Sequence, residues 1–208
     1  SREGRDRDLL VRYMIWGVST LNFARTITKW AAEREKPDVE REPGYQDRDK
    51  EVILSDLRQA QGNLSLEADR AVFAMFLERL GELPKGERLE AFEIRLGGDY
   101  STEKIDKFVD GLYAETRLGD AGHRIELFGR SVGELSKSAD PLIALALNMA
   151  PELDAIEKKQ KEEQGALSRL RPIYISSLVK MLGTGFYPDA NATPRISFAT
   201  VAGYTPFD

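Results

Sequence analysis

The stretch at the carboxyl end, residues 187–206, most constrains what this chain can fold into. It is the only segment with a convincing β-strand pattern, whereas the segments before it have helical patterns. A single strand leaves N–H and C=O groups unpaired along both edges, and even an isolated hairpin is marginal in water. We therefore expect a mainly α, multi-helix bundle-like domain whose short terminal strand belongs to a β-barrel outside these 208 residues.

The order of residue types in this stretch supports a turn followed by a strand. A proline at position 188 disfavours helix before it, and the Asp and Asn that follow form turns through their side chains. From Pro194 to Gly203 apolar residues fall on both alternating faces, which is typical of a strand inside a sheet. The candidate residues for the junction with that sheet are Tyr187, Pro188, Asp189, Asn191, Arg195, Gly203 and Tyr204.

Composition excludes several classes of protein. Hydrophobic residues make up 41% of the 208 and charged residues 31%, as in ordinary globular proteins. The 30 basic and 35 acidic residues are interspersed, so no basic face for nucleic acid is expected. The chain has no cysteine, which excludes disulfides and thiolate metal sites. The most apolar run, residues 9–18, is far shorter than the ~20 residues of a membrane span and predicts a buried core helix.

Helical periodicity organises the first half of the chain. We expect one long helix over 8–34, a proline-containing loop over 36–47 that could act as a hinge, and helices over 49–61, 67–83 and 85–96. The predicted buried face of the first helix consists of Tyr13, Trp16, Thr20, Phe23, Ile27 and Trp30. The helix over 67–83 has a predicted buried stripe of Val72, Met75, Phe76, Arg79 and Leu83.

The second half contains clear helix starts and stops. Gly97 and Gly98 should end a helix, Ser101 and Asp120 should each cap one, and Asp140 before a proline should begin a long one. We expect Pro151 to kink or restart that helix and Pro172 to break the next, which Tyr174, Leu178 and Leu182 line. The run 157–164 is expected to be solvated and to contain a Glu157–Lys161 pair. The predicted buried faces are Ile105, Phe108, Val109, Leu112 and Tyr113, then Leu142, Leu145, Ala146, Met149, Leu153 and Ile156.

The sequence offers no complete catalytic or ligand-binding motif. His123 is the only histidine, and we interpret it as a polar helix position. No serine lies in a nucleophile elbow, and no phosphate-binding glycine loop is present. Carboxylate pairs such as Glu162–Glu163 lie in surface-like runs, so an acid–base enzyme complete in this chain is only a third hypothesis. We predict no catalytic, cofactor-binding or metal-binding residue.

Several blocks resemble one family of enzymes in the same order. The terminal stretch 187–206 and residues 29–49, which contain REPGYQDRD, carry the most specific likeness. Residues 112–128, 140–147 and 171–178 resemble later helices of the same proteins. Together they resemble bacterial dipeptidyl-peptidase 7/11-type serine exopeptidases, in the region where the chain leaves a helical domain and re-enters the catalytic barrel.

The resemblance implies a function for the chain as part of a larger enzyme. Residues 1–183 would form a helical cap domain that confines peptide substrate, and residues 184–208 would return to the double β-barrel that bears the catalytic triad. The parent would need no cofactor, would remove N-terminal dipeptides, would act in the periplasm or outside the cell, and could be a homodimer. No membrane or nucleic-acid partner is expected, and these residues alone should be inactive. The alternative is a free-standing helical scaffold or protein-binding module.

Overall fold

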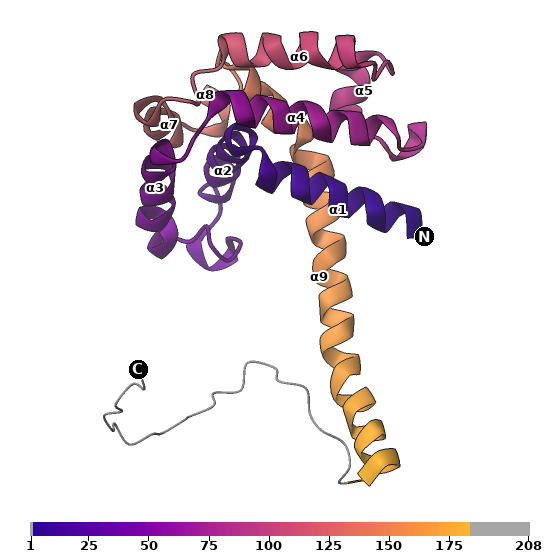
Figure 1. The fold of residues 1–208 in the computed structure, drawn as a ribbon. Coiled ribbons are helices and arrows are strands. Elements are labelled where there is room, and N and C mark those ends of the chain that lie inside the picture. Colours follow the sequence, from indigo (N-terminus) through magenta and orange to yellow (C-terminus); the bar gives the residue numbers. More distant parts are fainter. Residues whose placement is uncertain (1, 184–208) are drawn as a thin grey trace, which may run out of the picture. The chain divides into compact units, whose positions relative to one another are not determined.

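The computed structural model describes residues 2–183, and this part of the chain is mainly helical and contains no β-strand (Figure 1). The predicted terminal strand and all seven candidate junction residues, Tyr187 to Tyr204, lie outside the described residues. The chain divides into two compact units, residues 1–158 and 159–208. A mainly α fold is therefore confirmed for residues 2–183, while the strand and its barrel stay predictions.

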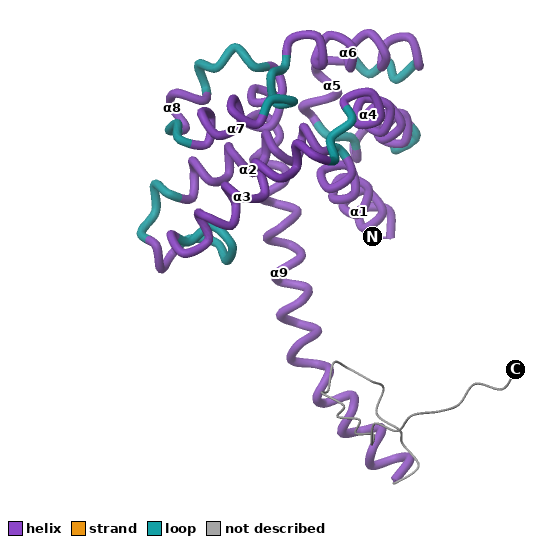
Figure 2. The backbone as a smooth tube through the Cα atoms, turned by 60° about the vertical axis from the view of Figure 1, so that its left-hand side comes forward, coloured by secondary structure: helices purple, strands orange, loops and turns teal. Residues whose placement is uncertain are grey.

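The first unit is built from eight helices and the beginning of a ninth. Helix α4 packs against α1 and α6, and α7 packs against α2 and α3. The connections between helices include four 3₁₀ turns, and the longest connection, residues 34–49, joins α2 to α3 (Figure 2). The helices are α1 (Arg2–Gly17), α2 (Ser19–Glu33), α3 (Lys50–Gln59), α4 (Leu66–Gly81), α5 (Glu90–Leu96), α6 (Thr102–Glu115), α7 (Ala121–Phe128), α8 (Val132–Leu135) and α9 (Pro141–Leu182), of which Pro141–Lys158 belongs to this unit.

A single hydrophobic core connects the helices of this unit. The rings of Trp30 and Phe128 stack with centroids 4.9 Å apart, and Phe92 makes edge contacts with Phe73 and Phe108. Buried apolar residues come from α1 through α9, so the core is formed within residues 2–158. Burial of this extent is what allows a helical body to be stable without a sheet.

The expected helix over 8–34 is wrong in one respect, because it is two helices that meet at Val18. This residue has extended backbone angles, φ −100° and ψ 99°. Because of this break, the predicted buried face does not extend along the first of the two helices. Tyr13 is 57% and Trp16 61% exposed, while Met14 and Val18 are buried. The core-helix prediction for 9–18 therefore holds for part of the run only, since Leu9 is also exposed.

Two further predictions for the first half need correction. In α4 the buried residues are Asp69, Phe73, Leu77 and Leu80, and not the predicted stripe, in which Met75 is 47% exposed. The expected helix over 85–96 begins as a 3₁₀ turn, Lys85–Glu87, and becomes helical again only at Glu90. The helix is interrupted at Arg88, whose backbone is extended. The side chain of Arg88 donates hydrogen bonds to the carbonyl oxygens of Gly81 and Leu83.

The loop over 36–47 and most of the predicted helix ends are confirmed. The loop contains only the 3₁₀ turns Asp38–Glu40 and Asp47–Asp49, with Gly44 at φ +90°. Gly97 and Gly98 end α5 with φ of +64° and +75°, a region that favours glycine. The side chain of Asp120 caps α7, whereas Ser101 occupies the N-cap position of α6 without a side-chain bond. The predicted faces of α6 and of the start of α9 are buried or half-buried.

Helix α9 runs without interruption from Pro141 to Leu182, so the predicted break at Pro172 and restart at Pro151 are wrong. An internal proline removes one backbone hydrogen bond and costs about 3 kcal/mol, which a long helix with good helix formers on both sides can absorb. Within the second unit, the described part of α9 exposes its apolar side chains, among them Leu167, Leu170, Ile173, Tyr174 and Leu182, and half-exposes Leu178.

Candidate functional site

The described residues contain no group of three or more histidine, cysteine, aspartate or glutamate side chains that could hold a metal ion. None of the helices in this part of the chain is both long enough and apolar enough to cross a membrane. Single polar side chains in the core and apolar surfaces are therefore the candidates for a functional site.

His123 lies on α7 beside two carboxylates. Its Nδ1 is 3.4 Å from Oε2 of Glu126, and its Nε2 is 3.9 Å from Oδ2 of Asp140. The Asp140 carboxylate is already occupied, because it accepts hydrogen bonds from Thr116 and from the backbone N–H groups that begin α9, including that of Leu142. Within residues 2–183 no serine hydroxyl bonds the His123 ring, so a Ser–His–Asp arrangement is not formed there.

The carboxylate of Asp69, on α4, is a second buried polar group with several hydrogen-bond partners. It accepts from the backbone N–H groups of Ser19 and Thr20 and from the Thr20 hydroxyl, and thereby caps the start of α2. It also accepts a 2.7 Å bond from the Tyr113 hydroxyl of α6. Burial raises the pKa of Tyr113, so this hydroxyl stays protonated and donates. One carboxylate thus fixes three helices relative to one another.

Arg124, on α7, is fully buried, and its hydrogen-bond partners are neutral. It donates to the carbonyl oxygens of Leu57 and Leu118 and to the side-chain oxygen of Gln61, while its guanidinium lies 4.5 Å from the centroid of the Phe23 ring. Burial lowers the pKa of Arg124. Each of its three side-chain nitrogens nevertheless donates a hydrogen bond. This side chain connects α7 to the end of α3 and to α2.

A third polar cluster joins α2 to the first part of α9. Glu157 accepts from the Arg25 guanidinium and, at 2.5 Å, from Nζ of Lys29. Glu157, expected on a solvated run, therefore takes part in a tertiary ion pair and is only about a third exposed, while its pair with Lys161 stays a prediction. In a further ion pair, Arg7 of α1 donates a 2.7 Å bond to Glu152 of α9. These bonds hold the start of α9 against the body of the unit.

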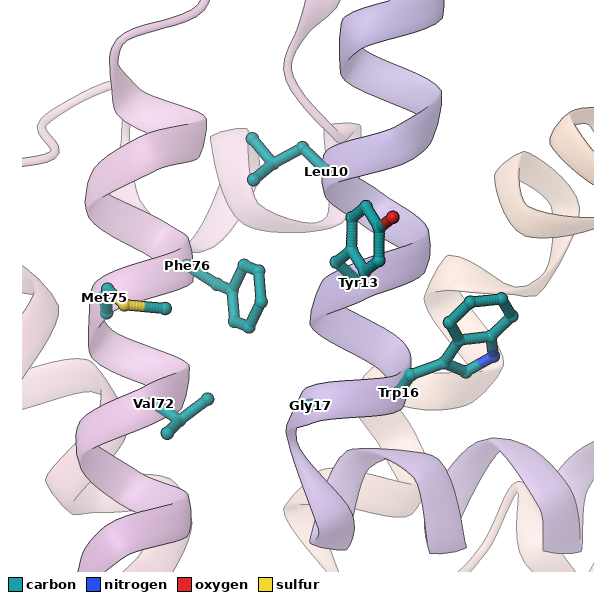
Figure 3. Close-up of a pocket in the computed structure, with 7 residues that line it drawn as sticks. All are labelled: Leu10, Tyr13, Trp16, Gly17, Val72, Met75 and Phe76. Atoms are coloured by element: carbon teal, nitrogen blue, oxygen red, sulfur yellow. The ribbon is translucent and has the colours of Figure 1, made fainter.

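An apolar groove of about 640 Å³ lies between α1 and α4 (Figure 3). On the α1 side it is lined by Leu10, Tyr13, Trp16 and Gly17, and on the α4 side by Val72, Met75 and Phe76. Figure 3 shows the Phe76 ring directed toward α1. Gly17 permits this approach, because a Cβ at that position would lie 3.0 Å from the Phe76 ring.

Asp69, Arg124 and Glu157 thus connect the helices of the first unit into one frame, and the groove between α1 and α4 is an open apolar surface beside it. Sequence reasoning did not find Asp69 or Arg124, because each bonds partners that lie far away in the sequence. A usable signal for Asp69 was the Gly17–Val18–Ser19–Thr20 series, which reads as a helix end followed by helix-capping residue types.

Comparison with known proteins now identifies the family. A family model described as Peptidase S46 matches residues 2–208. The chain is 31% identical over 191 residues to an Asp/Glu-specific dipeptidyl-peptidase of Shewanella putrefaciens, an alignment that covers 90% of this chain and 26% of that protein. It is 28% identical over 151 residues to an Asp/Glu-specific dipeptidyl-peptidase of Porphyromonas gingivalis, covering 72% of this chain and 21% of that protein.

The chain spans about a quarter of the length of these curated relatives. The family match, by contrast, extends over nearly every residue, including the stretch whose sequence suggested the resemblance. The serine exopeptidase resemblance is thereby confirmed at the level of the family: this chain belongs to the peptidase S46 family.

Proposed function

We propose that this chain is the helical cap of a serine-type dipeptidyl-peptidase, in which it confines the substrate and has no peptidase activity by itself. The observation that carries the proposal is the family match over residues 2–208, together with the likeness to dipeptidyl-peptidases of which this chain spans about a quarter. A dipeptidyl-peptidase relationship is shown by that match; the role of cap is our proposal.

The internal bonds of the first unit suit a part that acts by shape. A cap that narrows a cleft must hold its helices in a fixed arrangement, since small displacements of positioning groups reduce rates strongly. Asp69 connects α2, α4 and α6, and Arg124 connects α2, α3 and α7. Loss of the bonds of either side chain would leave buried partners without a hydrogen bond, which costs free energy. The frame therefore resists deformation.

The proposal also extends to the rest of the parent enzyme. Its double β-barrel would supply the triad and would receive the segment 184–208 at the candidate junction residues. Its substrate would be the N-terminal end of a peptide, and the names of the two relatives make dipeptides that contain Asp or Glu the first to test. A periplasmic or secreted location and a homodimeric parent are also part of this proposal.

The test compares two purified proteins, the 208-residue chain and the full-length product of its gene. Release of acidic and neutral dipeptides from fluorogenic dipeptidyl substrates is measured for both. We expect release from the full-length product alone, with the acidic substrate preferred. Dipeptide release by the 208-residue chain would refute the inactive cap. A gene product that ends at these residues and is inactive would favour the scaffold alternative.

A further inference from the structure

Neither the hydrogen-bonded frame nor the family match gives a role to the groove between α1 and α4. Its aromatic rim is exposed, with Tyr13 at 57% and Trp16 at 61%, and Met75 at 47% on the facing helix. Tyr13 and Trp16 meet edge to face with centroids 6.2 Å apart. Large aromatic side chains beside a groove are typical of the centre of an interface, and their exposure in a monomer is unfavourable.

The two tryptophans of the chain differ sharply in surroundings. Trp30 is 3% exposed and stacks on Phe128 inside the core. Trp16 is 61% exposed, although the Tyr13 ring meets it edge to face and the guanidinium of Arg12 lies 4.7 Å from the centroid of its ring. Among residues whose side chains the structure describes, no carboxylate is recorded within ion-pair distance of Arg12. A partner that covers Trp16 would therefore bring its apolar face to the ring and a carboxylate to Arg12.

We propose that the α1–α4 groove is the docking site of an amphipathic helix from the part of the parent enzyme outside these 208 residues, with an acidic residue placed to meet Arg12. A groove between two packed helices is the shape that receives the apolar face of a third helix. Leu10 and Gly17 are seven residues apart and mark about two helical turns, which is enough for anchors at i, i+3 or i+4, and i+7. Charge at Arg12 favours an acidic helix over a basic one.

The length of the relatives supports this source of the helix. About three quarters of each relative lies outside the region that this chain matches, so a large part of the parent remains to cover exposed surfaces. This inference rests on the proposal that the chain is part of a longer peptidase, and the activity assay above tests that proposal separately. If the full-length product releases dipeptides while the groove stays open, the docking inference alone fails.

The test is hydroxyl-radical footprinting read by mass spectrometry, on the 208-residue chain and on the full-length gene product. We expect Trp16 and Met75 to be oxidised rapidly in the 208-residue chain and about tenfold more slowly in the full-length product, because an interface core excludes water. Trp30 is the internal control and should react slowly in both. Equal oxidation of Trp16 in both proteins would overturn the proposal.

Two other outcomes would also overturn the proposal, because each would assign the groove to a different occupant. Protection of Trp16 that rises with the concentration of the 208-residue chain would assign the groove to a second copy of this chain. Protection that appears in the full-length product only after addition of an acidic peptide would assign the groove to substrate.

A pair of substitutions provides the second test. Met75→Glu places a charge in the groove and should lower the melting temperature of the full-length product by about 2–4 °C, while that of the 208-residue chain stays unchanged. The matched control is Val39→Glu, in a loop position that is 86% exposed, which should change neither protein. Equal shifts for Met75→Glu in both proteins, or none in either, would contradict the docking of a parent helix.

Discussion

The two halves of α9 have similar helical patterns and opposite surroundings. In residues 141–158 the apolar face is buried, with Leu145 and Met149 at 0% exposure. In residues 159–182 the apolar side chains are exposed, with Leu170 at 58% and Ile173 at 65%. The first half also forms ion pairs with other helices, because Glu152 and Glu157 bond Arg7, Arg25 and Lys29.

This difference shows that an amphipathic pattern predicts a helix with a face to bury but does not identify what covers that face. The first half is covered by residues of the same unit, and it contributes to the stability of that unit. The second half exposes a face of the same kind, which is what a helix that continues into a larger protein would have. Three predictions test this comparison, and a fourth, at Asp69, tests the frame of the first unit.

The largest effect is expected from matched leucine truncations in the two halves. Leu145→Ala removes a fully buried side chain and should lower the free energy of unfolding by about 3–5 kcal/mol. Leu170→Ala, in the exposed half, should change it by about 0.5 kcal/mol or less. Urea denaturation followed by circular dichroism measures both. Equal losses for the two variants would abolish the distinction between the halves.

A smaller loss is expected when the connection between α2, α4 and α6 is weakened. Asp69→Asn keeps the size of the side chain but replaces one acceptor oxygen with an NH₂ group, so either the bond from Ser19 or those from Thr20 and Tyr113 are lost. We expect a loss of about 2–3 kcal/mol in the same unfolding measurement. Glu67→Gln, on an exposed part of the same helix, is the control. A loss no greater than that of the control would show that Asp69 does not hold the frame.

The ion pair of Glu157 should make a smaller, pH-dependent contribution. Burial acts to raise the pKa of Glu157, but Lys29 and Arg25 outweigh it, and the net pKa lies below the ordinary value of 4.5. A carboxyl group with a lowered pKa stabilises the fold above its unfolded pKa, and this contribution is lost as pH falls through the folded value. Because Glu157 is about a third exposed, we expect Glu157→Gln to cost about 1 kcal/mol or less at pH 7.

The measurement is the difference in unfolding free energy between wild type and Glu157→Gln over a pH series. The difference should be constant near neutral pH and should shrink toward zero below about pH 4. A difference that grows on acidification would contradict the assigned ion pair.

The smallest effect on global stability is expected from Pro172→Ala. Alanine restores the backbone N–H that proline lacks, so the exposed half of α9 should become more helical by circular dichroism. The unfolding midpoint of the first unit should stay within error, since Leu167, Leu170 and Tyr174 do not contribute to its core. A clear rise in that midpoint would mean that the exposed half folds cooperatively with the first unit.

Helix ends and strongly amphipathic faces could be predicted from the sequence because their causes are local. Gly97 and Gly98 stop a helix through their backbone freedom, and Asp120 and Asp140 begin helices through side-chain bonds to N–H groups two or three residues away. The buried face of residues 141–158 was also predictable, since its apolar residues recur with one helical period.

Features that depend on distant residues could not be predicted in this way. The break at Val18 is stabilised by Asp69, about fifty residues away, and α4 has apolar residues on more than one side, so packing decides between Phe73 and Met75. Arg124 is buried only because Leu57, Leu118 and Gln61 supply oxygens around it. The predicted junction, Tyr187 to Tyr204, lies outside the described residues and stays a prediction.

The central claim is that these residues form a self-contained helical body joined to a half-helix that the rest of a peptidase covers. Amide hydrogen exchange, resolved by peptide along α9, tests it most directly. In the 208-residue chain, residues 142–158 should exchange only through global unfolding, and residues 159–182 should exchange orders of magnitude faster. In the full-length gene product the second half should become slow as well. Equal protection of both halves in the 208-residue chain, or a second half that stays fast in the full-length product, would contradict the account.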